Sequence, residues 1–230
     1  MTAEPPTADT QASTAGLRER KKQRTRAALL RTAVELFTTQ GYEETTIDEI
    51  VDAVEVSQRT FFRYFASKEE VAFALQHMVE QHFAAALHER PAHEGPFDAL
   101  RNSVLAAWDT IGEAITELVP IEDYLRLLQV IESTPALLAV HLRRSFEMEE
   151  NVARLIAERE GVDVDRDPRP RVAVAAFSGV MRVTGQLWGR REDTSLEAIR
   201  TLTEDYLDHL GPALASDWHT DLRSTAGSRA

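Results

Sequence analysis

The amino-acid sequence predicts an all-α protein, with a small N-terminal three-helix domain and a larger helical domain after it. Three observations predict this fold class. Apolar residues recur at intervals of three and four along most of the chain, as they do on the buried face of a helix. Capping motifs, glycines and prolines divide the chain into segments of helical length. No segment shows the strict alternation of a half-buried strand.

Composition limits the kind of protein this is. The chain has 230 residues, 43% of them hydrophobic, which is enough for one small and one larger core. It contains no cysteine, so disulfides and thiolate chemistry are excluded. No run approaches the ~18 consecutive apolar residues of a membrane span, and the first residues lack the apolar core of a signal peptide. We therefore expect a soluble, cytoplasmic protein.

The first helix follows a stretch without periodicity. Residues 1–17 are rich in Pro, Thr, Ala and Ser, so we predict a disordered N-terminal arm there. The helix is predicted to begin at Arg18 or Gln23 and to run to Gln40, with Gly41 ending it. Its first turns carry seven basic residues and one acidic residue. This basic run suits contact with phosphates or with a DNA minor groove, and the solvated start of an ordinary helix is the alternative.

Two short helices joined by a tight turn come next. Thr46 and Glu49 have the spacing of a capping box, which starts a helix. Ser57 can cap a second helix, predicted to run to about Phe65. Such a pair has the geometry of a helix-turn-helix, whose second helix enters the major groove of DNA. A further cap at Ser67 begins the following helix.

The second short helix divides into an inner and an outer face. Phe61 and Phe65 are four residues apart and are predicted to point inward with Val56. The outward positions combine Arg and Gln, which can bond base edges, with aromatic residues that a solvated face would not need. We interpret this helix as a recognition helix rather than as an amphipathic helix with spare aromatics. The outward residues are Gln58, Arg59, Thr60, Phe62, Arg63 and Tyr64.

The segments RTRAALLRTAVELFTTQGY and GYEETTIDEIVDAVEVSQRTFFRYFASKEEV resemble the N-terminal DNA-binding domain of TetR-type transcriptional regulators. The resemblance covers about residues 24–71 without gaps and implies a homodimeric, repressor-type regulator with a palindromic operator and a small-molecule effector. Carried over by position, the resemblance implies that Thr46 contacts a phosphate at the start of its helix. It also implies that Gln58, Arg59 and Thr60 face the bases, and that Phe62, Tyr64 and Lys68 contact the DNA backbone. Phe62 stands where tyrosine is frequent, so packing against a sugar or a thymine methyl replaces a phosphate bond there. The implied DNA-binding residues are Thr46, Ser57, Gln58, Arg59, Thr60, Phe62, Tyr64 and Lys68.

Charge is divided unevenly along the chain. The net charge is −12, yet residues 1–68 hold 10 basic and 10 acidic side chains, and residues 69–230 hold 16 basic and 28 acidic ones. The acidic part would repel nucleic acid. We therefore expect DNA to contact one end of the molecule only.

Domain boundaries follow from these signals. We place the DNA-binding domain at residues 18–66, a helical ligand-binding and dimerisation domain at 67–212, and a loose tail at 213–230. Gly and Pro residues separate the helices of the larger domain. The helices of the larger domain are predicted at residues 67–90, at 97–111, from Tyr124 onward, at 135–160, at 171–189 and from a cap at Thr194 to Gly211.

The helix at residues 171–189 is apolar nearly all round, so it must be covered on every side. We expect one face on its own core and another on a second subunit. With the last helix, it resembles the pair that makes the four-helix dimer interface in TetR-type regulators. The predicted interface residues are Ala176, Val180, Val183, Leu187, Ile199 and Tyr206.

The segment at residues 125–158 resembles the ligand domain of TetR-type regulators related to the mycofactocin regulator, some of which respond to acyl-CoA. We therefore expect a mainly apolar effector, with acyl-CoA as the candidate class. Large residues on the middle helices, with a histidine to orient the ligand, could line its pocket, and a plain core role is the alternative for each. These candidates are Trp108, Tyr124, His141, Phe146, Phe177, Met181 and Trp188.

No enzyme motif appears in the chain. There is no Gly-rich phosphate loop and no nucleophile elbow, and the alternating aspartates of the loop at 161–168 lack the Gly and Glu of a calcium loop. We expect no catalytic residue, metal or cofactor. Two other functions remain open, a non-specific DNA-packaging protein and a ligand carrier or enzyme that no longer binds DNA. The acidic larger domain weighs against the first, and the intact recognition face weighs against the second.

Overall fold

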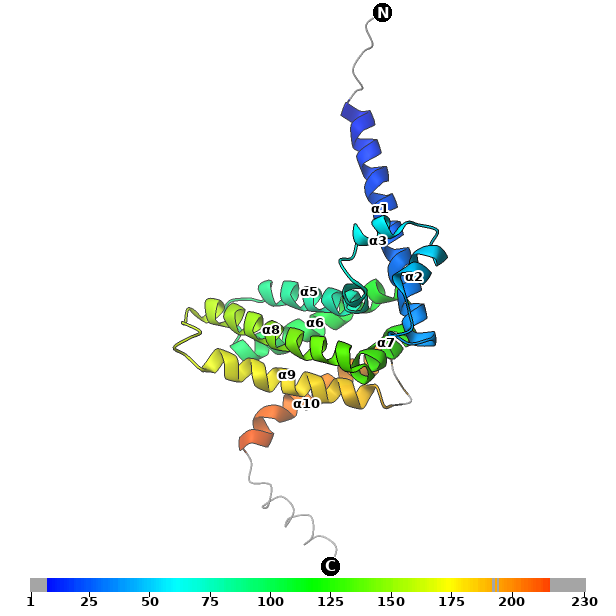
Figure 1. Ribbon diagram of the computed structural model, residues 1–230. Helices are drawn as coiled ribbons and strands as arrows, with labels where there is room; N and C mark the ends of the chain where they lie inside the picture. The colour runs from blue at the N-terminus through cyan, green and yellow to red at the C-terminus, as the bar shows by residue number, and fades with distance from the viewer. Residues whose placement is uncertain (1–7, 192, 194, 216–230) are drawn as a thin grey trace, which may run out of the picture. The chain divides into compact units, whose positions relative to one another are not determined.

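The computed structural model describes residues 8–191, 193 and 195–215. Over this part of the chain it contains ten helices and no strand, which confirms the predicted all-α fold (Figure 1). The chain divides into two compact units. We call residues up to 78 together with 113–141 the head unit, and residues 79–112 together with those from 142 onward the body unit. Within the described residues, no helix is both long enough and apolar enough to span a bilayer.

The head unit is built on its first helix, which packs against the second, fourth and seventh helices. The inner face of this helix carries Leu29, Ala33 and Phe37, which are fully buried. Tyr42 is also buried and its ring packs 5.2 Å from that of Phe37. The helices that lie wholly in this unit are α1 (Ala8–Thr39), α2 (Ile47–Ala53), α3 (Gln58–Phe62), α4 (Lys68–Ala72) and α7 (Ile121–Ser133).

The first helix begins earlier than predicted. It starts at Ala8, so residues 8–17, which we predicted to be disordered, are helical. Alanines are frequent in this stretch and the last nearby proline is Pro6. Alanine has the highest helix propensity of any residue, so a helix already nucleated at the buried face can extend outward. At its other end Gly41 has φ 96°, as predicted for the residue that ends the helix.

Two other predicted boundaries are wrong. The helix expected from Ser67 to Arg90 is interrupted at Phe73 (φ −95°, ψ 1°), which separates α4 from α5. Phe73 is buried and lies parallel to the His141 ring, 6.5 Å away, and local periodicity carries no sign of that distant contact. The last helix runs on through Pro212.

The body unit packs its helices around an apolar core. Phe83 stacks on Phe177 with their ring centroids 5.7 Å apart. The last two helices pack together, and ion pairs join the sixth helix to the tenth, from Arg101 to Asp208 (3.0 Å) and from Arg200 to Asp109. The helices that contribute to this unit are α5 (Ala74–His88), α6 (Pro96–Thr116), α8 (Pro135–Glu160), α9 (Arg169–Trp188) and α10 (Leu196–Ala215).

The turn between α2 and α3 depends on a glutamate in the left-handed conformation. Among the described residues other than glycine, Glu55 is the one with positive φ, at 56°. Its N–H donates to the carbonyl of Asp52 (3.1 Å), and the N–H of Val56 donates to that of Val51 (2.9 Å). These two bonds form a Schellman motif, in which glycine usually takes the left-handed position because a Cβ is crowded there.

Glu55→Gly is therefore expected to stabilise the head unit. Glycine avoids a steric cost of about 1–2 kcal/mol at positive φ, and this outweighs the roughly 0.5–1 kcal/mol lost through its greater freedom in the unfolded chain. Urea unfolding of the two proteins measures the difference. Ala53→Gly, at an exposed helical position two residues earlier, is the control and should cost about 1 kcal/mol. A lower unfolding midpoint for Glu55→Gly would contradict the assignment of strain to this turn.

Candidate DNA-binding surface

The second helix begins with the predicted capping box. The Thr46 hydroxyl accepts a hydrogen bond from the Glu49 N–H (3.2 Å), and the Thr46 N–H donates to Glu49 Oε2 (2.7 Å). The same carboxylate oxygen accepts from the Thr46 hydroxyl (2.9 Å). These bonds hold the pKa of Glu49 below its usual value. Both donors of Thr46 are thus occupied by a carboxylate, so the implied phosphate contact at Thr46 requires Glu49 to move.

The recognition helix is shorter than predicted. Ser57 caps it by accepting from the N–H of Thr60 (3.3 Å), and the helix ends at Phe62 rather than near Phe65. One further turn is closed by bonds from the N–H groups of Tyr64 and Phe65 to the carbonyl of Phe61. Phe61 and Phe65 are buried as predicted, which fixes the helix onto the head unit by its inner face.

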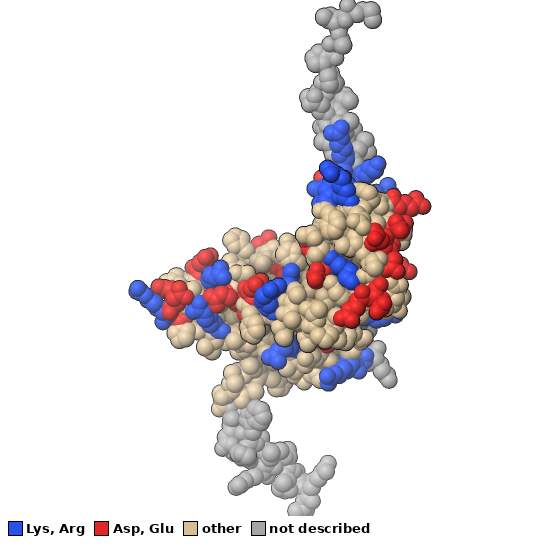
Figure 2. All heavy atoms as spheres, in the orientation of Figure 1, with Lys and Arg blue, Asp and Glu red and all other residues tan. Residues whose placement is uncertain are grey.

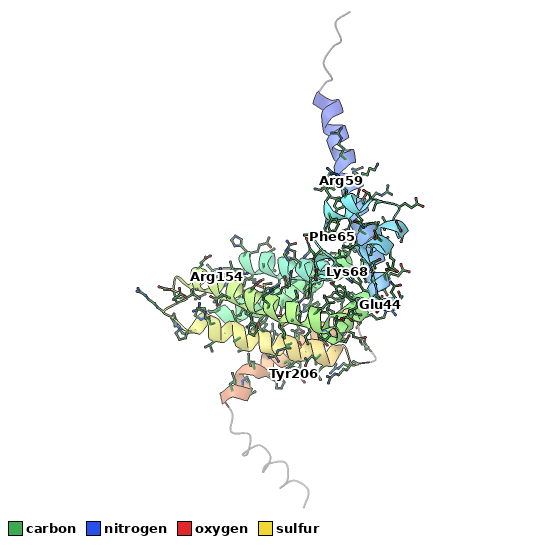
Figure 3. All side chains as sticks on the ribbon, in the orientation of Figure 1. Glu44, Arg59, Phe65, Lys68, Arg154 and Tyr206 are labelled. Carbon is green, nitrogen blue, oxygen red and sulfur yellow. The ribbon has the colours of Figure 1, made fainter. Side chains whose placement is uncertain are left out.

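The outer face of this helix presents an exposed basic side chain, Arg59. Arg59 is exposed, and no carboxylate lies within 4.0 Å of it in the described chain (Figure 3). By contrast, Gln58 donates to Asp48 Oδ1 on α2, and the Thr60 hydroxyl lies 3.1 Å from that of Ser57. Arg59 can therefore bond a base edge with all of its donors, whereas the Gln58 amide already donates from its nitrogen.

Phe62 is the exposed aromatic of the recognition helix. Half of its surface (50%) is accessible, and its ring meets the buried Phe61 ring edge-on with centroids 5.4 Å apart. This contact leaves one face of Phe62 for the apolar surface of a sugar or a thymine methyl. The contact of Phe62 with a sugar or a thymine methyl therefore stays a prediction.

Lys68 makes internal contacts. Its ammonium donates to the carbonyls of Tyr42 (2.6 Å) and Thr45 (2.7 Å) and lies 4.2 Å from the centre of the Tyr42 ring. Burial, with a smaller contribution from the charge of Glu69, raises the pKa of Tyr42 to about 12. The loop between α1 and α2 is thus tied to the start of α4, and one N–H of the ammonium is left for a phosphate.

Lys68→Ala is expected to lower stability as well as DNA affinity. The substitution removes two hydrogen bonds from a charged donor and leaves two part-buried carbonyls unpaired, which we expect to cost about 1–3 kcal/mol. Urea unfolding and DNA titration on the same preparations separate the two effects. Arg59→Ala, at an exposed position without a partner, is the control for stability and should unfold like the unmodified protein. Unchanged stability in Lys68→Ala would refute the structural role.

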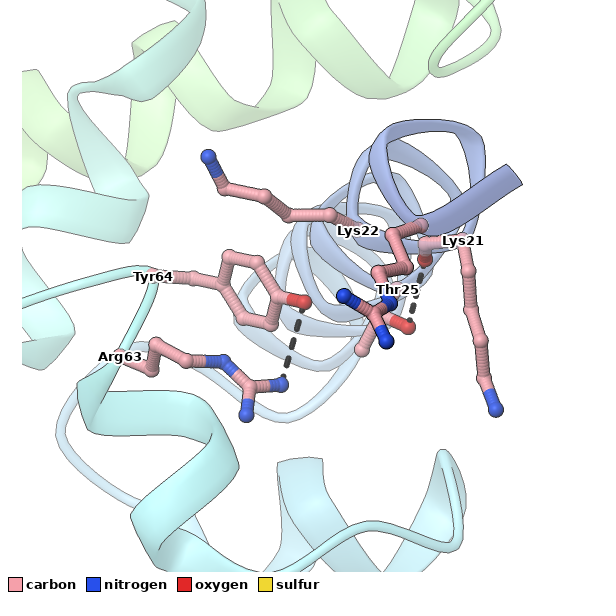
Figure 4. A pocket seen from close by; sticks show the side chains of 6 residues that line it. Lys21, Lys22, Thr25, Arg63 and Tyr64 are labelled. Carbon is pink, nitrogen blue, oxygen red and sulfur yellow. Dashed lines mark hydrogen bonds between the residues drawn. The ribbon is translucent and has the colours of Figure 1, made fainter. Parts of the chain in front are cut away.

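A basic groove lies between α1 and the end of the recognition helix. The α1 side is one helical face, since its residues are three or four positions apart. Arg63 is stacked over the Tyr64 ring at 4.9 Å and donates to the Tyr64 hydroxyl (3.2 Å) (Figure 4). Figure 2 shows basic side chains gathered at this end of the head unit. The residues that line the groove are Arg18, Lys21, Lys22, Thr25, Arg63 and Tyr64. The basic run of α1 and the outward residues Arg63 and Tyr64 were each predicted from the sequence. That they line one groove was not.

The predicted ligand-binding residues are divided between the two units. Trp108 and Met181 pack against the body core that includes Phe177, and the buried indole N–H of Trp108 has no hydrogen-bond partner among the residues that the structure describes. Tyr124 and His141 belong to the head unit, where His141 Nδ1 lies 3.1 Å from Gln76 Nε2.

Two of these residues have surroundings that the sequence did not indicate. Phe146 is 71% exposed and so lines no enclosed pocket of the chain. Helix α8 carries two apolar stripes, and the chain buries the one that includes Val152 and Ile156. Trp188 is buried and its indole N–H donates to the carbonyl of Ser195 (3.0 Å), which gives it a structural role at the turn between α9 and α10. The cap predicted at Thr194 lies outside the described residues.

Of the predicted dimer residues on α9, Val183 is exposed, whereas Ala176, Val180 and Leu187 are partly buried within their own chain. Val180 packs against the body core, and Val172, which was not predicted, is also exposed. Tyr206 is half-buried on α10 (Figure 3). Ile199 is buried within its own chain, so its assignment to the interface is wrong. The stripe on α10 faces its own core at this position, which helical spacing alone does not distinguish from a partner-facing stripe.

No group of three or more His, Asp or Glu side chains in the described residues is arranged to hold a metal ion.

Sequence comparison relates the chain to known proteins. Residues 29–75 match the family described as bacterial regulatory proteins, tetR family, and residues 94–215 match the MftR C-terminal domain family. The HTH-type transcriptional regulator TcmR of Streptomyces glaucescens is 49% identical over 203 residues, which cover 88% of this chain and 90% of TcmR. The putative mycofactocin biosynthesis transcriptional regulator MftR of Mycobacterium tuberculosis is 28% identical over 166 residues, which cover 71% of this chain and 79% of MftR.

Among solved structures, a transcriptional regulator from Aquifex aeolicus VF5 has a similar fold. The TM-score is 0.54 at 15% identity, over 82% of this chain and 99% of that one. At this level of identity the likeness concerns the fold alone, an N-terminal helix-turn-helix followed by a helical C-terminal domain.

Proposed function

The chain belongs to the TetR family of transcriptional regulators, with an MftR-like C-terminal domain, and we propose that it is a homodimeric repressor released from its operator by a small molecule. The observation that carries the proposal is the recognition helix, whose Arg59 is exposed, without an ion-pair partner among the described residues, at the position suited to base edges. The protein would act in the cytoplasm, on double-stranded DNA.

A homodimer would place its two recognition helices in successive major grooves, about 34 Å apart, on a palindromic operator. The exposed Val172 and Val183 on α9 support the dimer, since apolar side chains are costly to leave in water. Native mass spectrometry of the purified protein tests it directly. A monomer would remove the basis for a two-fold operator, whereas a dimer with added mass would identify a retained ligand.

The effector is proposed to be mainly apolar, with acyl-CoA as the first class to test. The apolar surroundings of Trp108, Phe177 and Met181 support an apolar ligand, and the unpaired indole N–H of Trp108 supplies one hydrogen-bond donor. By linkage, DNA must weaken effector binding by the same factor as the effector weakens DNA binding. Calorimetric titration with acyl-CoA tests the class. Absence of heat with any acyl-CoA, and binding of another class, would exclude it.

Arg59→Ala is expected to lose sequence preference. Removing a base-contacting arginine should weaken operator binding by ~1–3 kcal/mol and leave affinity for random DNA nearly unchanged. An operator is first obtained by selection from random duplexes, and both proteins are then titrated on operator and random DNA at one salt concentration. Arg154→Ala, an exposed change in the body unit, is the control. Equal losses on operator and random DNA would remove Arg59 from base reading.

A further inference from the structure

Gln58, the first residue of the recognition helix, is bonded to an acidic residue of the helix before it. Its amide nitrogen, Nε2, donates a hydrogen bond to Oδ1 of Asp48 on α2. Both side chains are exposed, so this bond lies on the outer surface of the head unit. Base contacts are made from the N-terminal part of a recognition helix. Gln58 therefore stands at a base-reading position while it is held by a second helix.

The bond to Asp48 fixes the direction of the Gln58 amide. A carboxylate has no hydrogen to donate, so the amide must turn its nitrogen and not its oxygen toward Asp48. The amide oxygen stays available, since no group of the described chain donates to it. The opposite orientation would place that oxygen against the carboxylate, where neither acceptor finds a donor. Asp48 thus leaves Gln58 with an acceptor for the DNA.

The direction of the amide decides which bases Gln58 can bond. In the major groove adenine presents an amino donor at N6 and cytosine presents one at N4, whereas guanine and thymine present only acceptors. An outward amide oxygen can accept from the first pair of bases and meets another acceptor on the second pair. A glutamine that turned freely would bond both kinds, because it would offer either its nitrogen or its oxygen.

The effect of Asp48 is expected to be largest in the complex with DNA. In the free protein water surrounds both side chains, so the Gln58 amide can turn at little cost. At a DNA interface water is excluded, and an acceptor without a donor becomes costly. Asp48 also adds a negative charge, which weakens attraction to phosphates. Its contribution is therefore to the choice of base and not to the overall affinity.

From these observations we propose that Asp48 is a positioning residue for base recognition. It orients Gln58 so that one position of each operator half-site is read as adenine or cytosine and is closed to guanine and thymine. Asp48 acts through Gln58 and does not touch the base. This inference rests on the proposed operator binding and adds to it the chemical class of one base.

The test is the selection of operators from random duplexes by variant proteins. Gln58→Ala identifies the position that Gln58 reads, because base preference is lost there alone. Asp48→Asn keeps the size of the side chain, but an amide can donate as well as accept, so Gln58 can take both orientations. Asp52→Asn is the matched control, since it removes the same charge from an exposed position of the same helix. Thermal unfolding checks that each variant is folded.

The unmodified protein should prefer adenine or cytosine at the Gln58 position by roughly tenfold, which is within the range of one good base contact. Asp48→Asn should reduce this preference to about twofold or less and leave the other positions of the operator unchanged. Asp48→Ala, which removes the partner altogether, should relax the same position. Asp52→Asn should select the operator of the unmodified protein.

Four results would overturn the proposal and leave the proposed function standing. They are a guanine or thymine at the Gln58 position, no position that depends on Gln58, an unchanged preference in both Asp48 variants, and relaxation of every position at once. Equal relaxation by Asp52→Asn would likewise assign the effect to charge and not to the orientation of Gln58. If the unmodified protein selects no sequence at all, the proposed function itself fails.

Discussion

Phe61→Ala is expected to abolish DNA binding by unfolding the recognition helix from the head unit. Phe61 is fully buried, and its ring packs against those of Phe62 and Phe65, with centroids 5.4 and 5.8 Å away. Truncating a buried phenylalanine costs about 3–5 kcal/mol, from lost transfer free energy and from the cavity left behind. A helix of five residues has little stability of its own. It therefore cannot survive the loss of its main buried side chain.

The adjacent Phe62 provides a matched control. Phe62→Ala removes the same side chain from an exposed position, so it should change the free energy of unfolding by less than about 1 kcal/mol. Urea unfolding followed by circular dichroism measures stability, and titration with the selected operator measures binding. The native mass spectrum of Phe61→Ala should show the same oligomeric state as the unmodified protein, because the body unit has its own core. Operator affinity within about twofold of the unmodified protein would contradict the packing argument.

Local chemistry explains which parts of the head could be predicted from sequence. The cap at Thr46 and Glu49 involves residues three apart, and the same holds for Ser57 with Thr60. Because each cap depends only on residues close together in the sequence, it can be predicted from them. The inward positions of Phe61 and Phe65 follow equally from helical spacing. These are the features that the structure reproduces.

The features that sequence reasoning missed depend on contacts between distant residues. Lys68 bonds carbonyls 23 and 26 positions away, so nothing near Lys68 distinguishes a tethering lysine from a DNA-binding one. The same limit applies to Phe146, which lies on one of two apolar stripes of α8, and to Ile199 in the predicted interface. Periodicity shows that a stripe is apolar, whereas only tertiary packing decides which stripe the chain itself covers.

The largest effect expected in the body unit is that of Arg159→Ala. The guanidinium of Arg159 donates to three backbone carbonyls of the connection between α5 and α6, those of Arg90 (2.9 Å), Pro91 and Glu94 (3.0 Å). The side chain is 13% exposed. The connection is also held by Glu94, which accepts from Arg90 Nε (2.8 Å) and from Asn102 (3.2 Å). Arg159 thus fastens this connection to the last turn of α8.

Removing that guanidinium should destabilise the body unit by about 3 kcal/mol, because three carbonyls lose a charged donor and two of these hydrogen bonds are part-buried. Arg154→Ala is the control on the same helix. Its side chain is 54% exposed and lies 3.9 Å from Glu150, so its loss should cost less than about 0.5 kcal/mol. Arg159→Lys separates charge from geometry, since an ammonium cannot reproduce the planar fork that reaches three acceptors. Thermal unfolding should therefore rank the proteins with Arg154→Ala near the unmodified chain, Arg159→Lys below it and Arg159→Ala lowest. If Arg159→Lys unfolds with the unmodified protein, the stabilisation comes from the positive charge, and the three hydrogen bonds are not its source.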